Sequence, residues 1–156
     1  MNYRELKPDE YGLLKLFTYE AIFIPEGSEP PDRSIIELPE LSLYYEAFGS
    51  KAADLCIVAE DEGDVVGAVW TRIMDDYGHI DDHTPSLAIS LIREYRGKGI
   101  GTKLLGKLLD QLKHNGYERV SLSVQKENYA VRMYEHAGFR TISENDEEFI
   151  MVCALN

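Results

Sequence analysis

The most regular hydrophobic pattern of the chain lies between residues 87 and 113. An apolar run at 87–92 is followed by a Gly-rich basic turn, and apolar residues then recur at helical spacing. Gly116 follows the last of them and suits a helix C-terminus. The pattern therefore predicts a buried strand, a tight turn and an amphipathic helix. The residues expected on the apolar face of that helix are Ile100, Leu104, Leu105, Leu108, Leu109 and Leu112.

The other segments also divide into strand-like and helix-like patterns. Alternating apolar positions predict strands, and apolar positions three or four residues apart predict helices. Such an order predicts a mixed α/β fold with helices on both faces of a sheet, in one domain of residues 1–156. In chain order we expect a strand at 3–6, helices at 8–23 and 39–48, strands at 54–60 and 65–74, the strand and helix described above, a strand at 120–124, a helix ending before Gly138, and a hairpin of 140–143 and 148–154.

Glycine and proline interrupt this pattern at two places. Residues 24–39 contain Pro25, Pro30 and Pro31, which block regular helix, so we expect a long irregular loop there. Gly67 lies inside the strand expected at 65–74, where a glycine marks a bulge or the close approach of another backbone.

Charge is distributed unevenly along the chain. The net charge is −12, which argues against a nucleic-acid partner because such partners require a basic surface. Residues 93–107 nevertheless hold five basic residues against one acidic residue, Glu94. The asymmetry suits an anionic cofactor at the turn and a cationic acceptor elsewhere.

Cysteines, histidines and apolar runs bound the remaining possibilities. Cys56 and Cys153 each lie in an apolar run without metal-ligand spacing, so we expect buried thiols in a reducing compartment. The acidic loop at 75–85 contains His79 and His83, but hydrated carboxylates explain it more simply than a metal, and we expect no metal. No run of about 20 apolar residues and no signal-peptide core occurs, so we expect no membrane association and a cytoplasmic location.

The Gly-rich turn before the amphipathic helix has the chemistry of an anion-binding site. The first N–H groups of a helix have no partner within it, and the helix dipole adds positive potential there. Gly97, Gly99 and Gly101 remove side chains that would block a phosphate. A Walker loop would need Gly-Lys-Ser/Thr, and the dinucleotide fingerprint would need a third glycine where Thr102 or Leu104 stands, so neither pattern is present.

Two motifs in this half of the chain resemble a known family. The first is Arg-x-x-Gly-x-Gly, at Arg96, Gly99 and Gly101. The second is strand–Asn–x–Ala–x–x–x–Tyr–x–x–x–Gly–Phe, which matches at Asn128, Ala130, Tyr134, Gly138 and Phe139. In their order and spacing the two resemble the acyl-CoA-binding motifs of the GCN5-related N-acetyltransferase (GNAT) superfamily. The resemblance is motif-specific over about residues 87–139 and implies a mostly antiparallel mixed sheet of about seven strands.

The resemblance also implies roles for individual residues. Turn amides would bind the pyrophosphate of acetyl-CoA, and the strand before the turn would splay from the next one, so that its free amides hold pantetheine. Leu91 would contact the thioester carbonyl, and Tyr134 would be the general acid, with helix packing as its alternative role. Asn128 would contact the cofactor or cap the helix. The cofactor-binding residues expected in this way are Leu91, Ile92, Arg96, Gly97, Lys98, Gly99, Ile100, Gly101, Thr102 and Asn128.

The general base is left open by the sequence. Many relatives carry an acidic residue near the position of Ser86, and the strand that contains Ser86 has no carboxylate here. The alternatives are Asp81, Asp82, Glu20 or a water relay through Ser90. In the family's layout, the loop at 24–39 and the aromatic residues of 39–48, with Tyr19, could line the acceptor site.

The sequence therefore predicts an acetyl-CoA-dependent N-acetyltransferase. We expect direct transfer of acetyl to the primary amine of a small cationic or amino acid-like acceptor. The alternatives are a protein N-terminal or lysine acetyltransferase, and a non-catalytic acyl-CoA sensor on the same fold. A homodimer is among the assemblies that the sequence allows.

Overall fold

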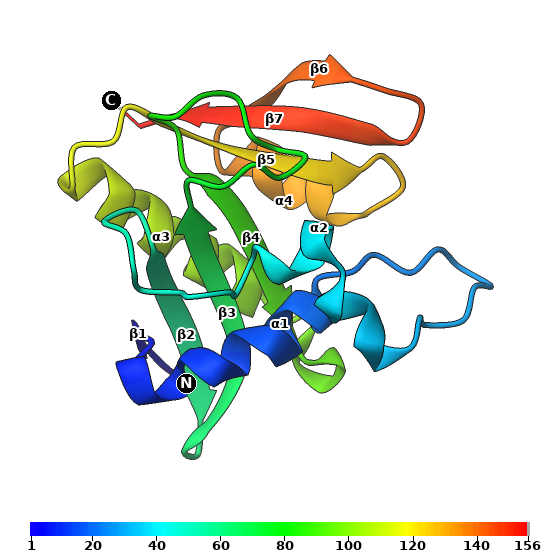
Figure 1. Cartoon of the computed structure of the whole chain (residues 1–156), viewed down its shortest axis with the longest axis vertical. Coiled ribbons are helices and arrows are strands. Elements are labelled where there is room, and N and C mark those ends of the chain that lie inside the picture. The colour runs from blue at the N-terminus through cyan, green and yellow to red at the C-terminus, as the bar shows by residue number, and fades with distance from the viewer. Residues whose placement is uncertain (156) are drawn as a thin grey trace.

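A seven-stranded sheet organises residues 1–155, which are the residues that the computed structural model describes (Figure 1). Asn156, the last residue of the predicted domain, lies outside them. The strand order in the sheet is β1-β2-β3-β4-β5-β7-β6, which confirms the predicted mixed sheet. The strands are β1 (Asn2–Glu5), β2 (Leu55–Asp61), β3 (Asp64–Arg72), β4 (Ser86–Leu91), β5 (Arg119–Gln125), β6 (Phe139–Glu144) and β7 (Glu148–Ala154).

The pairing between β4 and β5 differs from all other pairings in the described sheet. The other neighbours run antiparallel over several residues, whereas β4 and β5 are parallel and share the single register pair Ser86↔Ser121. Beyond this pair the two strands separate. The sheet therefore opens at its centre, between β4 and the group formed by β5, β7 and β6.

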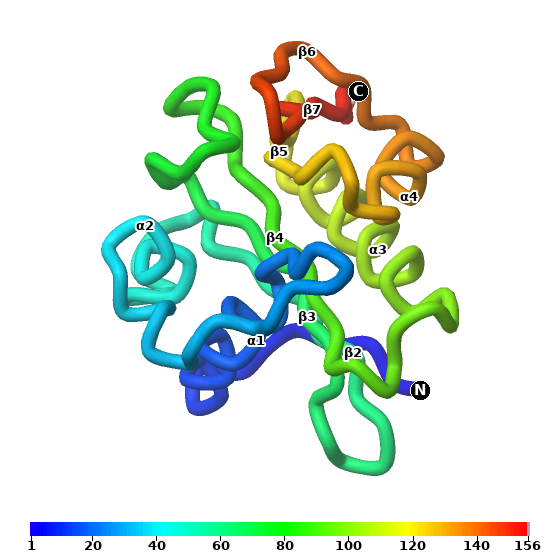
Figure 2. Tube along the Cα trace, turned by 90° about the vertical axis from the view of Figure 1, so that its right-hand side faces the viewer, coloured from blue at the N-terminus to red at the C-terminus, as the bar shows by residue number. Residues whose placement is uncertain are grey.

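Helices cover both faces of the sheet (Figure 2). The long helix α3 (Ile100–His114) and the short α4 (Ala130–His136) lie on one face, and α1 (Leu14–Glu20) and α2 (Pro39–Ser42) lie on the other. The predicted apolar stripe of α3 is confirmed, since Leu104, Leu105, Leu108 and Leu112 are at most 1% exposed. They pack in a core with β5 and β7, while Phe17 and Trp70 belong to a second core under α1.

The ends of α3 follow from two glycines. Gly99, with a φ of 83°, precedes the first helical residue. At the other end Gly116 has a φ of 90°, its N–H donates to the Lys113 carbonyl, and the N–H of Tyr117 donates to that of Leu112. These two hydrogen bonds together form the Schellman motif, so the predicted C-terminal cap is confirmed.

The first predicted helix is shorter and less regular than its pattern suggests. Residues Pro8–Leu13 form a 3₁₀ helix, and the α-helix ends at Glu20 instead of continuing to residue 23. The Ile22 N–H donates to the Tyr19 carbonyl, which tightens the last turn. Pro25 has no N–H to donate to the carbonyl four residues earlier, so the helix cannot continue through it.

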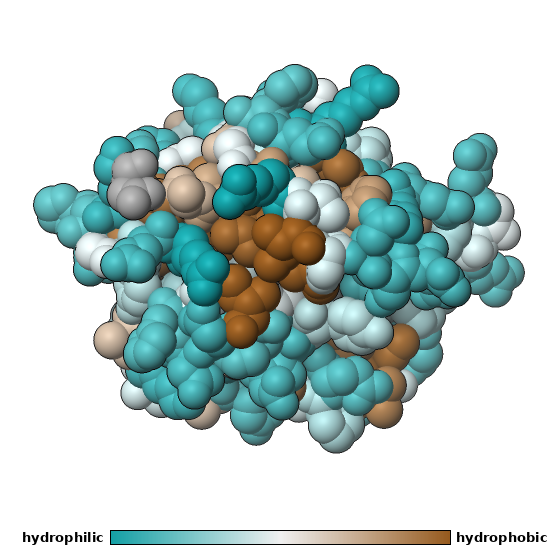
Figure 3. Space-filling view, turned by 90° about the horizontal axis from the view of Figure 1, so that it is seen from above, coloured by the Kyte–Doolittle hydropathy of each residue, from teal (hydrophilic) through white to brown (hydrophobic). Residues whose placement is uncertain are grey.

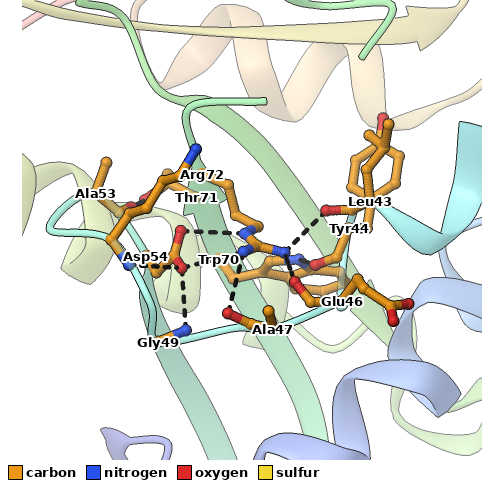
Figure 4. A network of polar contacts seen from close by, with 11 residues as sticks. Leu43, Tyr44, Glu46, Ala47, Gly49, Ala53, Asp54, Trp70, Thr71 and Arg72 are labelled. Carbon is orange, nitrogen blue, oxygen red and sulfur yellow. Dashed lines mark hydrogen bonds and ion pairs between the residues drawn. The ribbon is translucent and has the colours of Figure 1, made fainter. Parts of the chain in front are cut away.

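The second predicted helix, 39–48, was wrong beyond its first turn. The α-helix spans Pro39–Ser42, and a 3₁₀ helix at Arg33–Glu37 precedes it within the loop expected to be irregular. The reason lies in β3. The Arg72 guanidinium donates to the Leu43 carbonyl, which a continued helix would pair with the Ala47 N–H, and also to the carbonyls of Glu46 and Ala47 (Figure 4). Ala47 itself has a φ of 52°, which is not helical.

Gly67 marks a bulge, as one of the two readings of its position predicted. Ala59 pairs with Gly67 but Glu60 pairs with Val65, which leaves Val66 as the extra residue of β3. A β carbon at Gly67 would overlap the Leu91 side chain of β4. The close neighbour is therefore a side chain rather than another backbone.

The face of the molecule seen from above is mostly hydrophilic, with an apolar patch near its centre (Figure 3). Ile142 of the outer strand β6 is 50% exposed. None of the helices in the described part of the chain combines the length and the apolar character that crossing a membrane requires.

Candidate acyl-transfer site

The main chain of β4 faces the central opening with unpaired groups. The Ile92 N–H donates to the Val66 carbonyl of β3, and bonded pairs alternate along an antiparallel ladder. The N–H and C=O groups of Ile89 and Leu91 therefore point away from β3, toward β5. Because β5 has separated from β4 at this level, the N–H and C=O of Ile89 and the N–H of Leu91 are left for a ligand, while the Leu91 carbonyl accepts from the Arg96 side chain.

The Gly-rich turn continues directly from this strand. After a short 3₁₀ helix at Arg93–Tyr95, Gly97 and Gly99 have φ values of 73° and 83°, which favour glycine, and α3 begins at Ile100. A β carbon at either glycine would meet nothing within 4 Å. The space in front of the first N–H groups of α3 is thus open, as a phosphate requires.

The basic side chains around the turn do not all face this space. Arg96, expected at the cofactor, donates from Nε to the Leu91 carbonyl at 3.0 Å and from Nη2 to the Glu20 carboxylate at 2.9 Å. It therefore ties α1 to the end of β4. Lys98 is exposed, with its Nζ 5.7 Å from the centre of the Tyr95 ring.

Tyr134 and Asn128 lie beside the opening on the side of α4. Tyr134 is 7% exposed, stacks edge-on against Phe139 at 5.7 Å, and makes no hydrogen bond to another residue within 1–155. Burial raises the pKa of its hydroxyl, so it holds its proton at neutral pH. The Asn128 side-chain oxygen accepts the Ala130 N–H at 2.9 Å, which is the helix-capping role.

On the face of β4 that carries α1 and α2, the structure assembles a polar cluster that the sequence did not single out. The Tyr44 hydroxyl donates to Oδ2 of Asp76 at 2.8 Å, and the Ser86 hydroxyl donates to Oδ1 at 2.8 Å. Ser86 is the residue at which β4 and β5 part. Burial raises the pKa of Asp76, and the two hydroxyl hydrogen bonds oppose that rise. Asp76 thus brings a carboxylate to Ser86, the position where the family resemblance led us to look for an acid.

Tyr44 is held in place from β3. The Trp70 Nε1 donates to the Tyr44 carbonyl at 3.0 Å (Figure 4). Arg72 binds the carbonyls on either side of Tyr44 and forms a two-pronged ion pair with Asp54, at 3.1 and 3.2 Å. The Asp54 side chain is fully buried. The position of the Tyr44 hydroxyl therefore depends on a buried network that begins in the centre of the sheet.

The four alternatives considered for the general base are otherwise engaged or exposed. Asp81 pairs with Arg119, and Glu20 pairs with Arg96. Asp82 is exposed beside His79, and the Ser90 hydroxyl donates to the Phe17 carbonyl at 2.7 Å. Within residues 1–155, no group of three or more His, Cys, Asp or Glu side chains is arranged to hold a metal ion. Cys56 and Cys153 are buried free thiols, as expected.

A separate groove of about 480 Å³ runs between α3 and α4. It contains Thr102 of the predicted cofactor set, and otherwise follows the helices toward the end of β7. It lies beside the turn rather than in the opening of the sheet. The other groups that line it include Gly106, Leu109, Lys113, Met133, His136 and Cys153.

Comparisons with known proteins agree with this geometry. Residues 19–139 match the family model described as the acetyltransferase (GNAT) family. An uncharacterized N-acetyltransferase of Bacillus subtilis is 40% identical over 74 residues, 47% of this chain and 28% of the relative. A mycothiol acetyltransferase of Propionibacterium freudenreichii is 32% identical over 92 residues, 58% of this chain and 29% of the relative. The chain thus spans less than a third of the length of these curated relatives.

The fold has close counterparts among solved structures. A putative acetyltransferase from Salmonella typhimurium, solved with its cofactor acetyl-CoA, aligns with a TM-score of 0.71 and 18% identity over 100% of this chain and 94% of that one. At that identity the likeness concerns the fold, including the seven-stranded, mostly antiparallel sheet. From the family-model match, which covers most of the sequence, we conclude that the chain belongs to the acetyltransferase (GNAT) family.

Proposed function

We propose that the chain is an acetyl-CoA-dependent N-acetyltransferase that acetylates the primary amine of a small cationic or amino acid-like acceptor. The observation that carries the proposal is the open sheet centre: the unpaired main-chain groups of Ile89 and the unpaired N–H of Leu91 lead directly into a Gly-rich turn with open space before a helix N-terminus. That combination suits a long ligand with an amide-containing arm and a diphosphate. Membership of the family supports the same reading.

In this proposal the coenzyme site follows the chain from β4 into α3. Residues 97–102 would supply main-chain N–H groups for the diphosphate, since the Arg96 N–H donates to the Arg93 carbonyl, and Leu91 and Ile92 would lie at the amide-containing arm. The Asn128 cap keeps the start of α4 beside the opening. Arg96 contributes by fixing the end of β4 through its bond to the Leu91 carbonyl.

Acetyl-CoA supplies an activated thioester, and the residues of this chain would supply position and protons. The Leu91 N–H would donate to the thioester oxygen as negative charge develops there. The neutral acceptor nitrogen forms a bond to the carbonyl carbon, and the carbon–sulfur bond breaks. Tyr134 would give its proton to the departing sulfur. The nitrogen would release one proton to water, from which the Tyr134 oxygen would regain one, so that a free thiol, an amide and the original tyrosine result.

The experiment is a thiol-release assay with acetyl-CoA over a panel of amines, run on the wild-type chain, Tyr134→Phe and the control Tyr129→Phe. Tyr129 is 74% exposed and lies in the same segment. We expect turnover of cationic amines, a loss of about 100- to 10,000-fold in kcat for Tyr134→Phe, and little change for Tyr129→Phe.

Two results would contradict the proposal. Acetyl-CoA binding without turnover of any amine would indicate a sensor instead of an enzyme. Equal turnover by Tyr134→Phe and wild type at every pH would remove the general-acid role while leaving the transferase activity intact.

A further inference from the structure

Among residues 1–155, helices pack on one face of the outer strand β6 and leave the other face open. Phe139 of β6 pairs with Cys153 of β7, and both belong to the core beneath α3 and α4. On the opposite side of the sheet, α1 packs on β3 and β4, and α2 packs on the 3₁₀ helix that precedes it. The residues of β6 after Phe139 are all exposed. Figure 3 looks down on the end of the molecule where β6 and β7 lie in Figure 1, and it shows an apolar patch there.

The register of β6 and β7 shows which side chains lie on the open face. Successive residues of a strand point to opposite faces, and residues paired across two strands share a face. Phe139 points to the helices, so Arg140 and its pair Val152 point away from them. Ile150 and Glu148, two and four residues before Val152 on β7, point the same way as Val152.

The centre of the open face is apolar. Thr141 and Ser143 pair with successive residues of β7, so Ile142 is the extra residue of a bulge, and Ile142 and Ser143 together oppose Ile150. Ile142 is exposed, and Ile150 is partly exposed. A bulge disfavours pairing of a strand edge with another strand, so the face is the surface left for a partner. We call four residues of this face the β6–β7 strip: Arg140, Ile142, Ile150 and Glu148.

The two ends of the β6–β7 strip carry opposite charges. Arg140 lies at the level of Val152, and Glu148 lies four residues from Val152, so Ile150 is midway, roughly 7 Å from each level. Among the described residues, no oppositely charged side chain lies within 4.0 Å of Arg140 or Glu148. Glu148 accepts a hydrogen bond from the Gln125 amide at 3.5 Å, and that donor is neutral. Both charges are therefore available to a partner.

This arrangement fits a second copy of the same chain. A copy laid face to face on the strip, and turned by half a revolution about an axis that crosses the strands at Ile150, exchanges the two ends of the strip. Arg140 of each copy then lies at the level of Glu148 of the other, and the isoleucines of both copies meet between these pairs. The same patch serves both copies in such an isologous contact, so the assembly closes at two. A partner with charge of one sign would match only one end.

We propose that the chain forms a symmetric dimer through the β6–β7 strip, with two isoleucines of each copy at its centre and an ion pair of Arg140 and Glu148 at each end. A dimer of this kind is independent of the proposed transferase activity. It would nevertheless approach the candidate site. Burial, Asp76 and then the charge of Glu148 raise the pKa of Tyr44, so Glu148 lies near the polar cluster around Asp76. The arginine of the second copy would therefore approach that cluster.

The first test measures the mass of the wild-type chain by sedimentation equilibrium at rising concentration. We expect an equilibrium between monomer and dimer. Ile142→Asp should raise the dissociation constant about a hundredfold or more, because it buries a charge in the apolar centre on both copies. Leu38→Asp is the control, since Leu38 is 45% exposed outside the strip, and it should leave the dissociation constant unchanged.

An exchange of charges tests the two-fold arrangement itself. Arg140→Glu and Glu148→Arg should each raise the dissociation constant at least about tenfold, because like charges then face each other at both ends. The double variant should recover most of the wild-type affinity, because the two-fold axis brings the exchanged charges together again. General damage to the fold would not be reversed by the second substitution.

Three results would overturn the inference. The first is a wild-type chain that stays monomeric at every concentration. The second is a dimer whose dissociation constant Ile142→Asp leaves unchanged, which would place the interface elsewhere. The third is a double variant that binds no more tightly than the two single variants.

Discussion

The two sides of the central opening are built in different ways. The coenzyme side consists of one continuous segment, from Leu91 to Thr102, and its functional groups are main-chain amides shaped by glycines. The other side, where the acceptor is proposed to bind, gathers Tyr44, Asp76 and Glu148 from segments far apart in the chain, and its polar groups are side chains. The first side depends mainly on local backbone conformation, whereas the second depends on packing elsewhere in the fold.

If this contrast is right, the largest effect should come from Arg72. Replacing it with methionine leaves the Asp54 carboxylate buried without its cation and the carbonyls of Leu43, Glu46 and Ala47 without their donor. We expect a loss of about 3–5 kcal/mol in the free energy of unfolding, measured by urea denaturation. The exposed Arg93→Met is the control and should change it by less than about 0.5 kcal/mol. A cost below about 1 kcal/mol for Arg72→Met would show that the acceptor side does not depend on this network.

A smaller effect is expected on the coenzyme side, and only from a substitution that changes the preferred backbone conformation. Gly99 has a φ of 83° with open space around it, so valine there would be strained by conformation and not by crowding. We expect coenzyme A affinity, measured by calorimetry, to fall about tenfold, which corresponds to about 1–2 kcal/mol of strain. Lys98→Ala is the control, because it removes a charge next to Gly99 and leaves the glycines of the turn unchanged. It should lower the affinity for coenzyme A no more than a few-fold. The reverse order of effects would mean that side-chain charge, and not the main chain, holds the coenzyme.

The smallest effect concerns the contact between the two sides. Arg96 joins the Gly-rich turn to Glu20 of α1, and its side chain is 37% exposed. A double-mutant cycle with Glu20→Gln and Arg96→Gln, measured by urea denaturation, should give a coupling of about 0.2–1 kcal/mol, since exposed ion pairs are weak. A coupling above about 2 kcal/mol would show that the two sides form one cooperative unit and are not built independently.

The difference in construction explains what could be predicted from the sequence. The strand, turn and helix at residues 87–113 were predicted because hydrophobic spacing and glycine positions are local properties of the chain. The helix at 39–48 was predicted too long because its carbonyls bond to Arg72, a residue more than 20 positions away. No short stretch of sequence around Tyr44 contains that information.

The polar cluster around Asp76 could not be predicted for the same reason. In the sequence, Asp76 is one of four aspartates in an acidic loop, and nothing near it distinguishes it from Asp75, Asp81 or Asp82. Its place in the cluster follows from Ser86 on the next strand and from Tyr44 before β2, which only the folded chain brings together. The one available signal was a serine at the strand position where relatives carry an acid. It indicated that a carboxylate would have to come from another segment, but not from which one.

Because β4 and β5 separate, β4 has unpaired main-chain groups, as a strand at the edge of a sheet does. An exposed edge strand can pair with a strand of another chain unless it is covered. A pantetheine arm, with its own amide groups, would fill the place that a neighbouring strand leaves vacant here. The coenzyme would then complete the sheet as well as supply the acyl group, and its binding energy would add to the cohesion of the molecule.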